Sequence, residues 1–153
     1  MREASTVGDI CVRHVAVAPP HLSVDEAARL MRERHVGCVV VVEQGDGGRL
    51  PSGVLTDRDI VTAVVAKDVD AKTLRVGDVM SPSVVTVRED DSLYDALTLM
   101  RHHGVRRLPV VGAHGVLAGL VALDDVVGAL AGQLQAAALV VGRELRHEAA
   151  LRP

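Results

Sequence analysis

The sequence contains no tryptophan and no phenylalanine, and Tyr94 is its single tyrosine, although 48% of its 153 residues are hydrophobic. The core must therefore be built from valine, leucine, alanine and methionine. Stacking of bases on aromatic rings, which single-strand nucleic-acid binders use, is nearly excluded. The net charge of −3 also argues against an electrostatic grip on a phosphate backbone. We therefore expect no nucleic-acid partner.

Cysteine is scarce as well, and the two cysteines, Cys11 and Cys38, form no CxxC pair. Cys38 lies in an apolar run, which indicates a buried thiol rather than a reactive one. No apolar run approaches the length that crosses a membrane, and residues 1–10 lack the apolar core of a signal peptide. We therefore predict a soluble, cytoplasmic protein without a membrane partner.

An internal duplication is the strongest pattern in the sequence. Residues 7–42 align with 76–111 at a constant offset of 69, with 12 identities in 36 positions. After a three-residue difference in the next loop, Gly53 and Asp59 match Gly119 and Asp125 at an offset of 66. Chance does not account for this agreement, so we infer two copies of one structural unit.

Each copy is predicted to fold as strand, helix, strand, strand and helix. Ser23 and Ser92 begin the first helices, because each is followed three residues later by a carboxylate that completes a capping box. The buried stripe of these helices is Ala27, Leu30 and Met31, mirrored by Ala96, Leu99 and Met100. The strands are predicted at 15–18, 38–42 and 53–55, and at 84–87, 108–111 and 119–121. Residues 43–52 are expected to form a surface loop, and 68–75 a linker.

The tail after Asp124 contains no proline up to Leu151, and its apolar residues step by three or four, which predicts a long helix. One interpretation is a helix that covers the flank of its own module. The other is a helix that packs on a second copy of the chain. Helical periodicity shows a buried face but not what buries it. The stripe consists of Val127, Leu130, Leu134, Ala138, Val141 and Leu145.

A hydroxyl and two carboxylates mark the point where the third strand of the first copy meets its second helix. Thr56, Asp57 and Asp59 follow an apolar run and precede residues at helical spacing. A helix N-terminus suits an anion, and a carboxylate one turn in can accept hydrogen bonds from sugar hydroxyls. The same Thr-x-x-Asp spacing also fits a capping box, so local evidence leaves both interpretations open.

These features together resemble the cystathionine β-synthase (CBS) domain pair, often called a Bateman module. The matching residues are 53–61 (GVLTDRDIV), Met80-Ser81-Pro82 and 105–110 (VRRLPV). The resemblance implies an α/β (α+β) fold of two tandem β-α-β-β-α repeats, 7–67 and 76–131, packed as a pseudo-two-fold pair. Residues 132–153 would be a helical extension. The resemblance covers roughly 7–131, which implies a stand-alone pair without an attached catalytic domain.

The family's modules bind adenosine-containing ligands in two clefts between the repeats. The resemblance implies that the aspartate of the Thr/Ser-x-x-Asp motif holds the ribose, and that the hydroxyl and nearby arginines face phosphate. Residues expected in the first cleft are Thr56, Arg58, Asp59, Val84, Val85, Val105, Arg106 and Arg107. Those expected in a weaker second cleft are Val15, Ala16, Val36, Gly37, Cys38 and Asp125. Because Ala122 replaces the hydroxyl there, we expect that cleft to be empty, weak or suited to an uncharged nucleoside.

The predicted function is a non-enzymatic sensor that binds AMP, ADP or ATP, with NAD and S-adenosylmethionine as alternatives, and signals to an unidentified protein partner. AMP and ATP are the leading candidates, and no obligatory cofactor is expected. The resemblance also implies a homodimer. The alternative is a structural adaptor with vestigial clefts. An enzyme is disfavoured because no Ser/His/Asp order, Walker loop or metal-spaced cluster is found. His102 and His103 diverge by about 100° on a helix, so no metal site is predicted.

Overall fold

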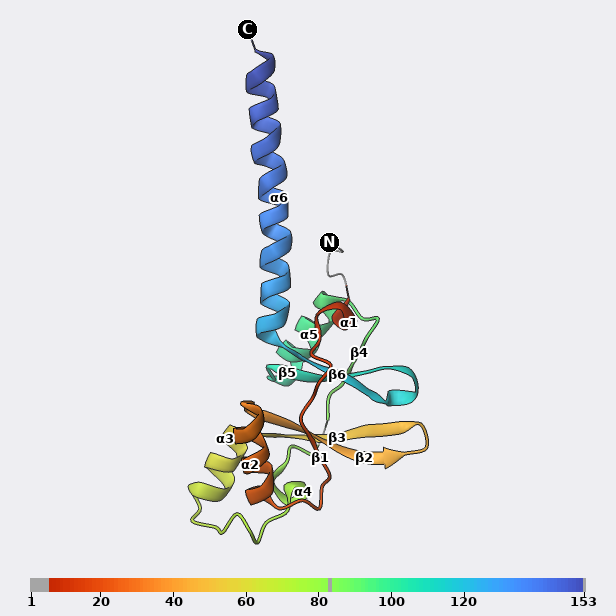
Figure 1. Cartoon of the computed structure of the whole chain (residues 1–153), viewed down its shortest axis with the longest axis vertical. Helices are drawn as coiled ribbons and strands as arrows, with labels where there is room; N and C mark the ends of the chain where they lie inside the picture. The colour runs from red at the N-terminus through yellow and green to blue at the C-terminus, as the bar shows by residue number, and fades with distance from the viewer. Residues whose placement is uncertain (1–5, 83, 153) are drawn as a thin grey trace.

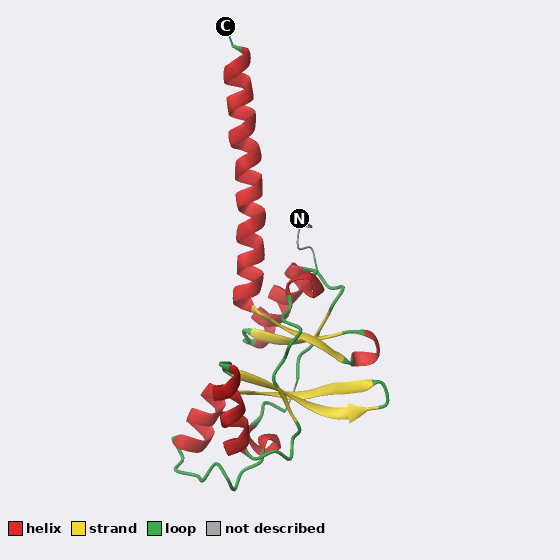
Figure 2. Ribbon diagram, in the orientation of Figure 1, coloured by secondary structure: helices red, strands yellow, loops and turns green. Residues whose placement is uncertain are grey.

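The computed structural model describes residues 6–82 and 84–152, which form two three-stranded sheets with helices on their outer faces (Figures 1 and 2). Repeat 1 contains β1 (Val17–Ala18), α2 (Val24–Arg34), β2 (Cys38–Gly45), β3 (Gly48–Thr56), α3 (Asp57–Ile60) and the π-helix η1 (Val61–Val65). Repeat 2 contains β4 (Val87–Arg88), α5 (Leu93–His103), β5 (Arg107–Val111), the 3₁₀ turn η2 (Ala113–Gly115), β6 (Leu117–Ala122) and α6 (Leu123–Leu151). Two short helices, α1 (Val7–Ile10) and α4 (Val76–Val79), precede the repeats. The predicted fold class is confirmed.

The two sheets have the same topology and the same irregularity. In each, a short first strand pairs parallel with the second, and the second pairs antiparallel with the third. The register shifts between Val41 and Val42 in β2 and between Val110 and Val111 in β5, which are equivalent positions. A bulge at the same place in both copies indicates one inherited strand geometry.

The valine-rich strand β2 is buried on both faces, as its unbroken apolar run predicts. Val39 and Val41 pack in a cluster with Ala27 and Met31 of α2. Val40 and Val42, one residue out of phase, pack instead against Leu117 of the other sheet. This alternation follows from the period of two in a strand, and it joins the two sheets face to face.

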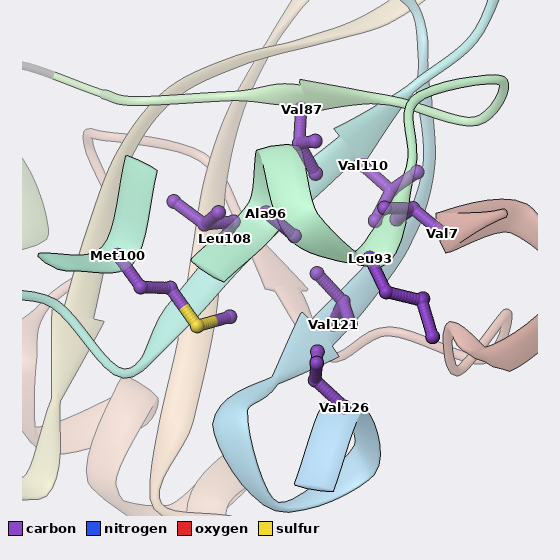
Figure 3. Packing of buried hydrophobic residues seen from close by; sticks show 9 residues of the cluster. All are labelled: Val7, Val87, Leu93, Ala96, Met100, Leu108, Val110, Val121 and Val126. Carbon is purple, nitrogen blue, oxygen red and sulfur yellow. The ribbon is translucent and has the colours of Figure 1, made fainter. Parts of the chain in front are cut away.

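The two hydrophobic cores are completed by an exchange of short helices, which the sequence analysis did not predict. Val7 of α1 is fully buried in the core of repeat 2, where Figure 3 shows it beside Leu93 and Val110. Val76 of α4 is fully buried in the core of repeat 1, and its N–H donates to the carbonyl of Leu22 (2.8 Å). Each repeat therefore depends on a segment that precedes the other one.

The glycines at equivalent positions 53 and 119 explain how these segments cross. A Cβ on Gly53 would lie 2.5 Å from the sulfur of Met80 and 2.9 Å from the carbonyl oxygen of Ser81. A Cβ on Gly119 would lie 2.7 Å from the sulfur of Cys11 and 2.8 Å from a backbone oxygen. The segment that precedes each repeat thus runs directly over the third strand of the other, where only glycine fits.

Two expectations about the chain between elements were wrong. Residues 43–52 are not a surface loop: β2 and β3 continue through them as a hairpin that closes by pairing Gly45 with Gly48. The first strands also differ from the prediction: only Val17–Ala18 and Val87–Arg88 pair with a neighbour, so both are shorter, and the second ends one residue after the predicted range. The capping boxes at Ser23 and Ser92 are confirmed, with Ser23 Oγ 3.2 Å from Glu26 N and Ser92 Oγ 3.1 Å from Asp95 N.

The predicted tail helix is confirmed as α6, but it does not lie across its own module. Val126 is fully buried at its base, whereas Leu134, Val141 and Leu145 are 73%, 55% and 62% exposed. Figure 1 shows α6 running away from both sheets.

The expectation that no apolar segment approaches a membrane span is also wrong by length and composition. α6 has 29 residues and contains an 18-residue window of mean hydropathy 1.4, and 6% of that window is buried.

Candidate functional site

The structure brings all residues predicted for the first cleft together around a cavity of about 460 Å³ between the repeats, called cavity 1. Thr56 ends β3, and Arg58 and Asp59 lie in α3, so these three come from repeat 1. The others come from the segment before β4 and from the start of β5 in repeat 2. The volume falls within the range of about 300–1,000 Å³ that small-molecule pockets occupy. The lining residues are Val54, Thr56, Asp57, Arg58, Asp59, Ser81, Val84, Val85, Gly104, Val105, Arg106, Arg107 and Pro109.

Thr56 and Asp59 form the capping box at the mouth of α3. The N–H of Asp59 donates to Thr56 Oγ1 (3.1 Å), and the N–H of Thr56 donates to Asp59 Oδ2 (2.8 Å). These bonds hold the carboxylate at a defined place on the cavity wall. No described residue donates a hydrogen bond to Asp59 Oδ1, and a carboxylate can accept about four hydrogen bonds. The cap therefore leaves Asp59 able to accept from a ligand.

Three arginines line cavity 1, Arg58, Arg106 and Arg107, and the two adjacent ones differ in their partners. Arg106 makes an ion pair with Asp124 (3.4 Å) in which both side chains are largely exposed, at 71% and 87%. Such an exposed pair stabilises a fold by about 1 kcal/mol at most. The guanidinium of Arg107 makes no ion pair with any residue in the described part of the chain. Arg107 is thus the more available of the two adjacent cations for an anion.

The second predicted cleft is a smaller cavity of about 290 Å³, called cavity 2, and all six residues predicted for it line the wall. The N–H of Ala122 donates to Asp125 Oδ2 (2.9 Å), so half of the capping box is kept. The other half is lost because Ala122 has no hydroxyl. The lining residues are Val12, His14, Val15, Ala16, His35, Val36, Gly37, Cys38, Arg107, Leu120, Ala122 and Asp125.

Sequence comparison of the repeats missed three polar residues in cavity 2. His35 ends α2 in the left-handed conformation (φ 54°), the position that Gly104 (φ 64°) occupies at the end of α5. A side chain therefore stands in cavity 2 where cavity 1 has none. His14 comes from the segment that crosses between the repeats. Arg107 lines both cavities, whereas the predicted second cleft contained no arginine.

Cys38 lines cavity 2, at the position that Arg107 holds in repeat 2. It is 4% exposed, and burial raises its pKa from 9.0 to about 11, with Arg107 acting in the opposite direction. Burial disfavours the thiolate because the charge loses its hydration. The expectation of a buried thiol is confirmed.

No group of three or more histidine, cysteine, aspartate or glutamate side chains is placed to hold a metal ion within residues 6–82 and 84–152. The adjacent His102 and His103 pack edge to face, with ring centroids 4.8 Å apart. This arrangement places the rings against each other rather than around a common point.

A family model described as the CBS domain matches residues 7–66 and 76–132. The chain belongs to the CBS domain family, as the sequence resemblance predicted. Residues 133–151 of α6 lie beyond the matched region.

Known relatives agree with this assignment. The CBS domain-containing protein YhcV of Bacillus subtilis is 42% identical over 122 residues, which cover 80% of this chain and 83% of that protein. The protein MK0525 of Methanopyrus kandleri is 38% identical over 127 residues, covering 83% of this chain and 63% of that protein. Among solved structures, the cytosolic domain of the Mg²⁺ channel MgtE in complex with ATP matches with a TM-score of 0.68 and 28% identity, covering 81% of this chain and 48% of that one.

Proposed function

We propose that the protein is a non-enzymatic sensor that binds an adenosine-containing nucleotide in cavity 1 and passes this signal to a partner protein. AMP and ATP are the leading candidates, followed by ADP, NAD and S-adenosylmethionine. The observation that carries the proposal is the composition of cavity 1. Asp59, with an unused acceptor oxygen, stands on one wall, and Arg106 and Arg107 stand on the wall supplied by the other repeat.

The chemistry of these groups matches the parts of a nucleotide. A carboxylate accepts hydrogen bonds from the two ribose hydroxyls, and guanidinium groups pair with phosphate oxygens, often through two parallel bonds. The apolar side chains of Val84, Val85 and Val105 offer a surface for the flat base. The ATP complex of the MgtE cytosolic domain, a structural relative, supports the assignment of this ligand class.

A ligand that touches both repeats can act as a switch by linkage. Because cavity 1 takes one wall from each repeat, a bound nucleotide stabilises the relative arrangement of the repeats that it fits best. Only the difference in affinity between two arrangements can drive such a change. A partner that binds one arrangement more tightly would then respond to the nucleotide.

A structural adaptor with vestigial clefts is the second candidate, and cavity 2 favours it. There, Ala122 has replaced the hydroxyl, and Gly37 and Cys38 stand where repeat 2 carries two arginines. The exposed apolar surface of α6 fits an adaptor equally well, since it offers a contact surface to a second copy.

A thermal-shift panel of AMP, ADP, ATP, NAD, S-adenosylmethionine and GTP tests the sensor against the adaptor. A ligand that binds only the native state stabilises it by mass action and so raises the melting temperature. At a ligand concentration of one hundred times its Kd, the free energy of unfolding rises by about 2.7 kcal/mol. We expect a shift with at least one adenosine compound and none with GTP. Unchanged melting temperatures with every compound would favour the adaptor, and product formation from ATP or NAD on long incubation would overturn the non-enzymatic assignment.

A further inference from the structure

Arg107 occupies a special position relative to the two cavities. It begins β5, as Cys38 begins β2, and the two residues are equivalent in the duplication. Arg107 lines cavity 1 together with Asp59 and cavity 2 together with Asp125. The electrostatic influence of Arg107 on Cys38, which lines cavity 2, agrees with the placement of Arg107 beside that cavity. One side chain therefore belongs to both sites.

The two cavities depend on Arg107 to different degrees. Cavity 1 has two further guanidinium groups, those of Arg58 and Arg106. Of the described residues that line cavity 2, Arg107 is the one that carries a guanidinium, and Asp125 adds a negative charge there. His14 and His35 can donate hydrogen bonds there, but of the described lining residues Arg107 is the one that is always cationic, so an anionic ligand in cavity 2 would depend on Arg107 more than an uncharged nucleoside would.

A guanidinium group directs its donors in one plane and pairs with a single phosphate through two parallel bonds. When that phosphate lies in cavity 1, the two donors that hold it are not available to a ligand in cavity 2. The bound phosphate also neutralises the cation and repels a second anion nearby. Both effects act against phosphate in cavity 2 and leave an uncharged ligand unaffected.

We propose that Arg107 couples the two cavities, so that a phosphorylated ligand in cavity 1 weakens the binding of a second phosphorylated ligand in cavity 2, while adenosine binding there is unchanged. The inference rests on the proposed nucleotide site in cavity 1. The coupling is reciprocal by linkage, and couplings between protein sites are commonly about 5- to 150-fold in affinity. The protein would then respond to the ratio of phosphorylated to uncharged ligand rather than to one ligand alone.

The test is a site-resolved NMR titration of the full chain with AMP and, separately, with adenosine. The backbone amides of Asp59 and Gly104 report on cavity 1, and those of Gly37 and Asp125 report on cavity 2. In the parent protein we expect AMP to saturate cavity 1 first and cavity 2 only at much higher concentration. In Asp59→Asn, which weakens cavity 1, we expect the affinity of cavity 2 for AMP to rise by about 5- to 150-fold.

Two arginine variants provide a matched pair. Arg107→Ala should weaken AMP binding in both cavities. In the Arg107→Ala background, Asp59→Asn should no longer change the affinity of cavity 2 for AMP. Arg106→Ala removes a guanidinium from cavity 1 alone, so it should weaken AMP binding there and leave cavity 2 dependent on Arg107. The same affinity of cavity 2 for adenosine is expected in the parent protein and in all three variants.

The outcomes separate this inference from the proposed function. If the cavity 1 amides of the parent protein do not respond to AMP, the proposed nucleotide site is wrong. If they respond but cavity 2 has the same affinity for AMP in the parent and in Asp59→Asn, or binds no AMP in either, the coupling is wrong and the site stands. An equal effect of Arg106→Ala on both cavities would likewise overturn the role of Arg107.

Discussion

The two repeats have the same backbone arrangement, but they supply different side chains to the two cavities. In repeat 1 the N–H of Asp57 donates to the carbonyl of Gly37 (2.9 Å), and in repeat 2 the N–H of Leu123 donates to the carbonyl of Arg106 (2.8 Å). These equivalent bonds hold the start of each second helix against the residue that precedes the second strand of the same repeat. The two second helices therefore start in the same way, although the cavities beside them differ in volume.

Side chains at a few equivalent positions make the clefts unequal. Repeat 1 supplies Thr56 to cavity 1, and repeat 2 supplies Ala122 to cavity 2. A Cβ on Gly37 would lie 2.7 Å from the Asp57 carboxylate, which is the end of an exposed side chain and would have to move aside. The comparison teaches that a few side-chain exchanges, and not a difference in the backbone, leave cavity 2 with fewer partners for phosphate than cavity 1.

The second helices of the repeats differ most. In repeat 1 the helix passes into a π-helical turn, in which the N–H of Ala66 donates to the carbonyl of Val61, and ends. In repeat 2 it continues as α6 to Leu151. Residues 126–142 of α6 contain no charged side chain, and a helix that is apolar on all sides is normally covered. We propose that a second copy of the chain covers it.

The largest expected effect is on dimerisation, which we assign to the second helix of repeat 2 and not to that of repeat 1. Truncation after Gly132 should convert a homodimer into a monomer, and Leu134→Glu in the full chain should raise the dimer dissociation constant at least about ten-fold, because burying one leucine is worth about 1.5–3 kcal/mol. Light scattering at micromolar concentration measures both.

The matched control is Leu139→Glu, which lies about 140° from Leu134 around the helix and off the predicted stripe. It should leave the dimer intact. A parent protein that is monomeric at about 16 kDa, or one that associates with lipid vesicles through α6, would contradict pairing with a second copy.

The next effect compares the two capping aspartates. Asp59→Asn should weaken every ribose ligand by roughly ten- to a hundred-fold, because a charged acceptor is worth about 1.5–3 kcal/mol to its donors. Asp125→Asn changes the equivalent cap in repeat 2, so it should match the small loss of stability but leave the tight site unchanged. Titration calorimetry with AMP compares them, and equal binding by both variants and the parent would leave Asp59 with a capping role alone.

Much of this fold follows from local sequence rules, and the exceptions have physical reasons. The duplication, the capping serines and the valine strands predicted the elements because each is a signal within a few residues. The hairpin at 43–52 was missed because its polar and glycine-rich residues are those of loops. The exchange of α1 and α4 was missed because a four-residue helix has no periodicity, and its packing partner lies in the other repeat.

The candidate site was predictable to a similar extent. Positions in the two clefts transfer between repeats by alignment, and the structure brings every one of them to the expected cavity. Alignment treats each repeat separately, however, so it assigned Arg107 to one cleft. That Arg107 lines both cavities depends on how the two repeats face each other, which alignment within a repeat does not show.

A further comparison concerns the equivalent positions of Cys38 and Arg107. The folded protein holds the Cys38 proton up to a pKa of about 11, against 9.0 for a free thiol. The contribution of Cys38 to the free energy of unfolding is therefore fully present below pH 9 and is lost as the pH rises through about 11. The total loss is about 2–3 kcal/mol. Cys38→Ala should lack this part of the loss. Urea unfolding of both proteins at pH 8 and pH 11 measures it, and parallel losses would show that Cys38 does not contribute.

The smallest effect exchanges the two N-caps. Thr56 and Ala122 have nearly the same backbone conformation, with φ and ψ of −108° and 161° against −104° and 156°. A threonine at 122 can therefore place its hydroxyl to accept from the N–H of Asp125, as Thr56 accepts from Asp59. Ala122→Thr should stabilise the protein by about 1 kcal/mol, and Thr56→Ala should destabilise it by about the same amount. For a chain of this size, that is a shift of about 2–4 °C in melting temperature, upward and downward respectively.

Because Gly37 and Cys38 are unchanged, Ala122→Thr should give no new affinity for phosphate in cavity 2. Calorimetric melting with and without AMP checks both parts: a stabilised protein with an unchanged response to AMP means that the cap and the ligand site are separable in repeat 2. Tight binding of a second AMP by Ala122→Thr would instead show that the missing hydroxyl, and not the missing arginines, sets the two repeats apart.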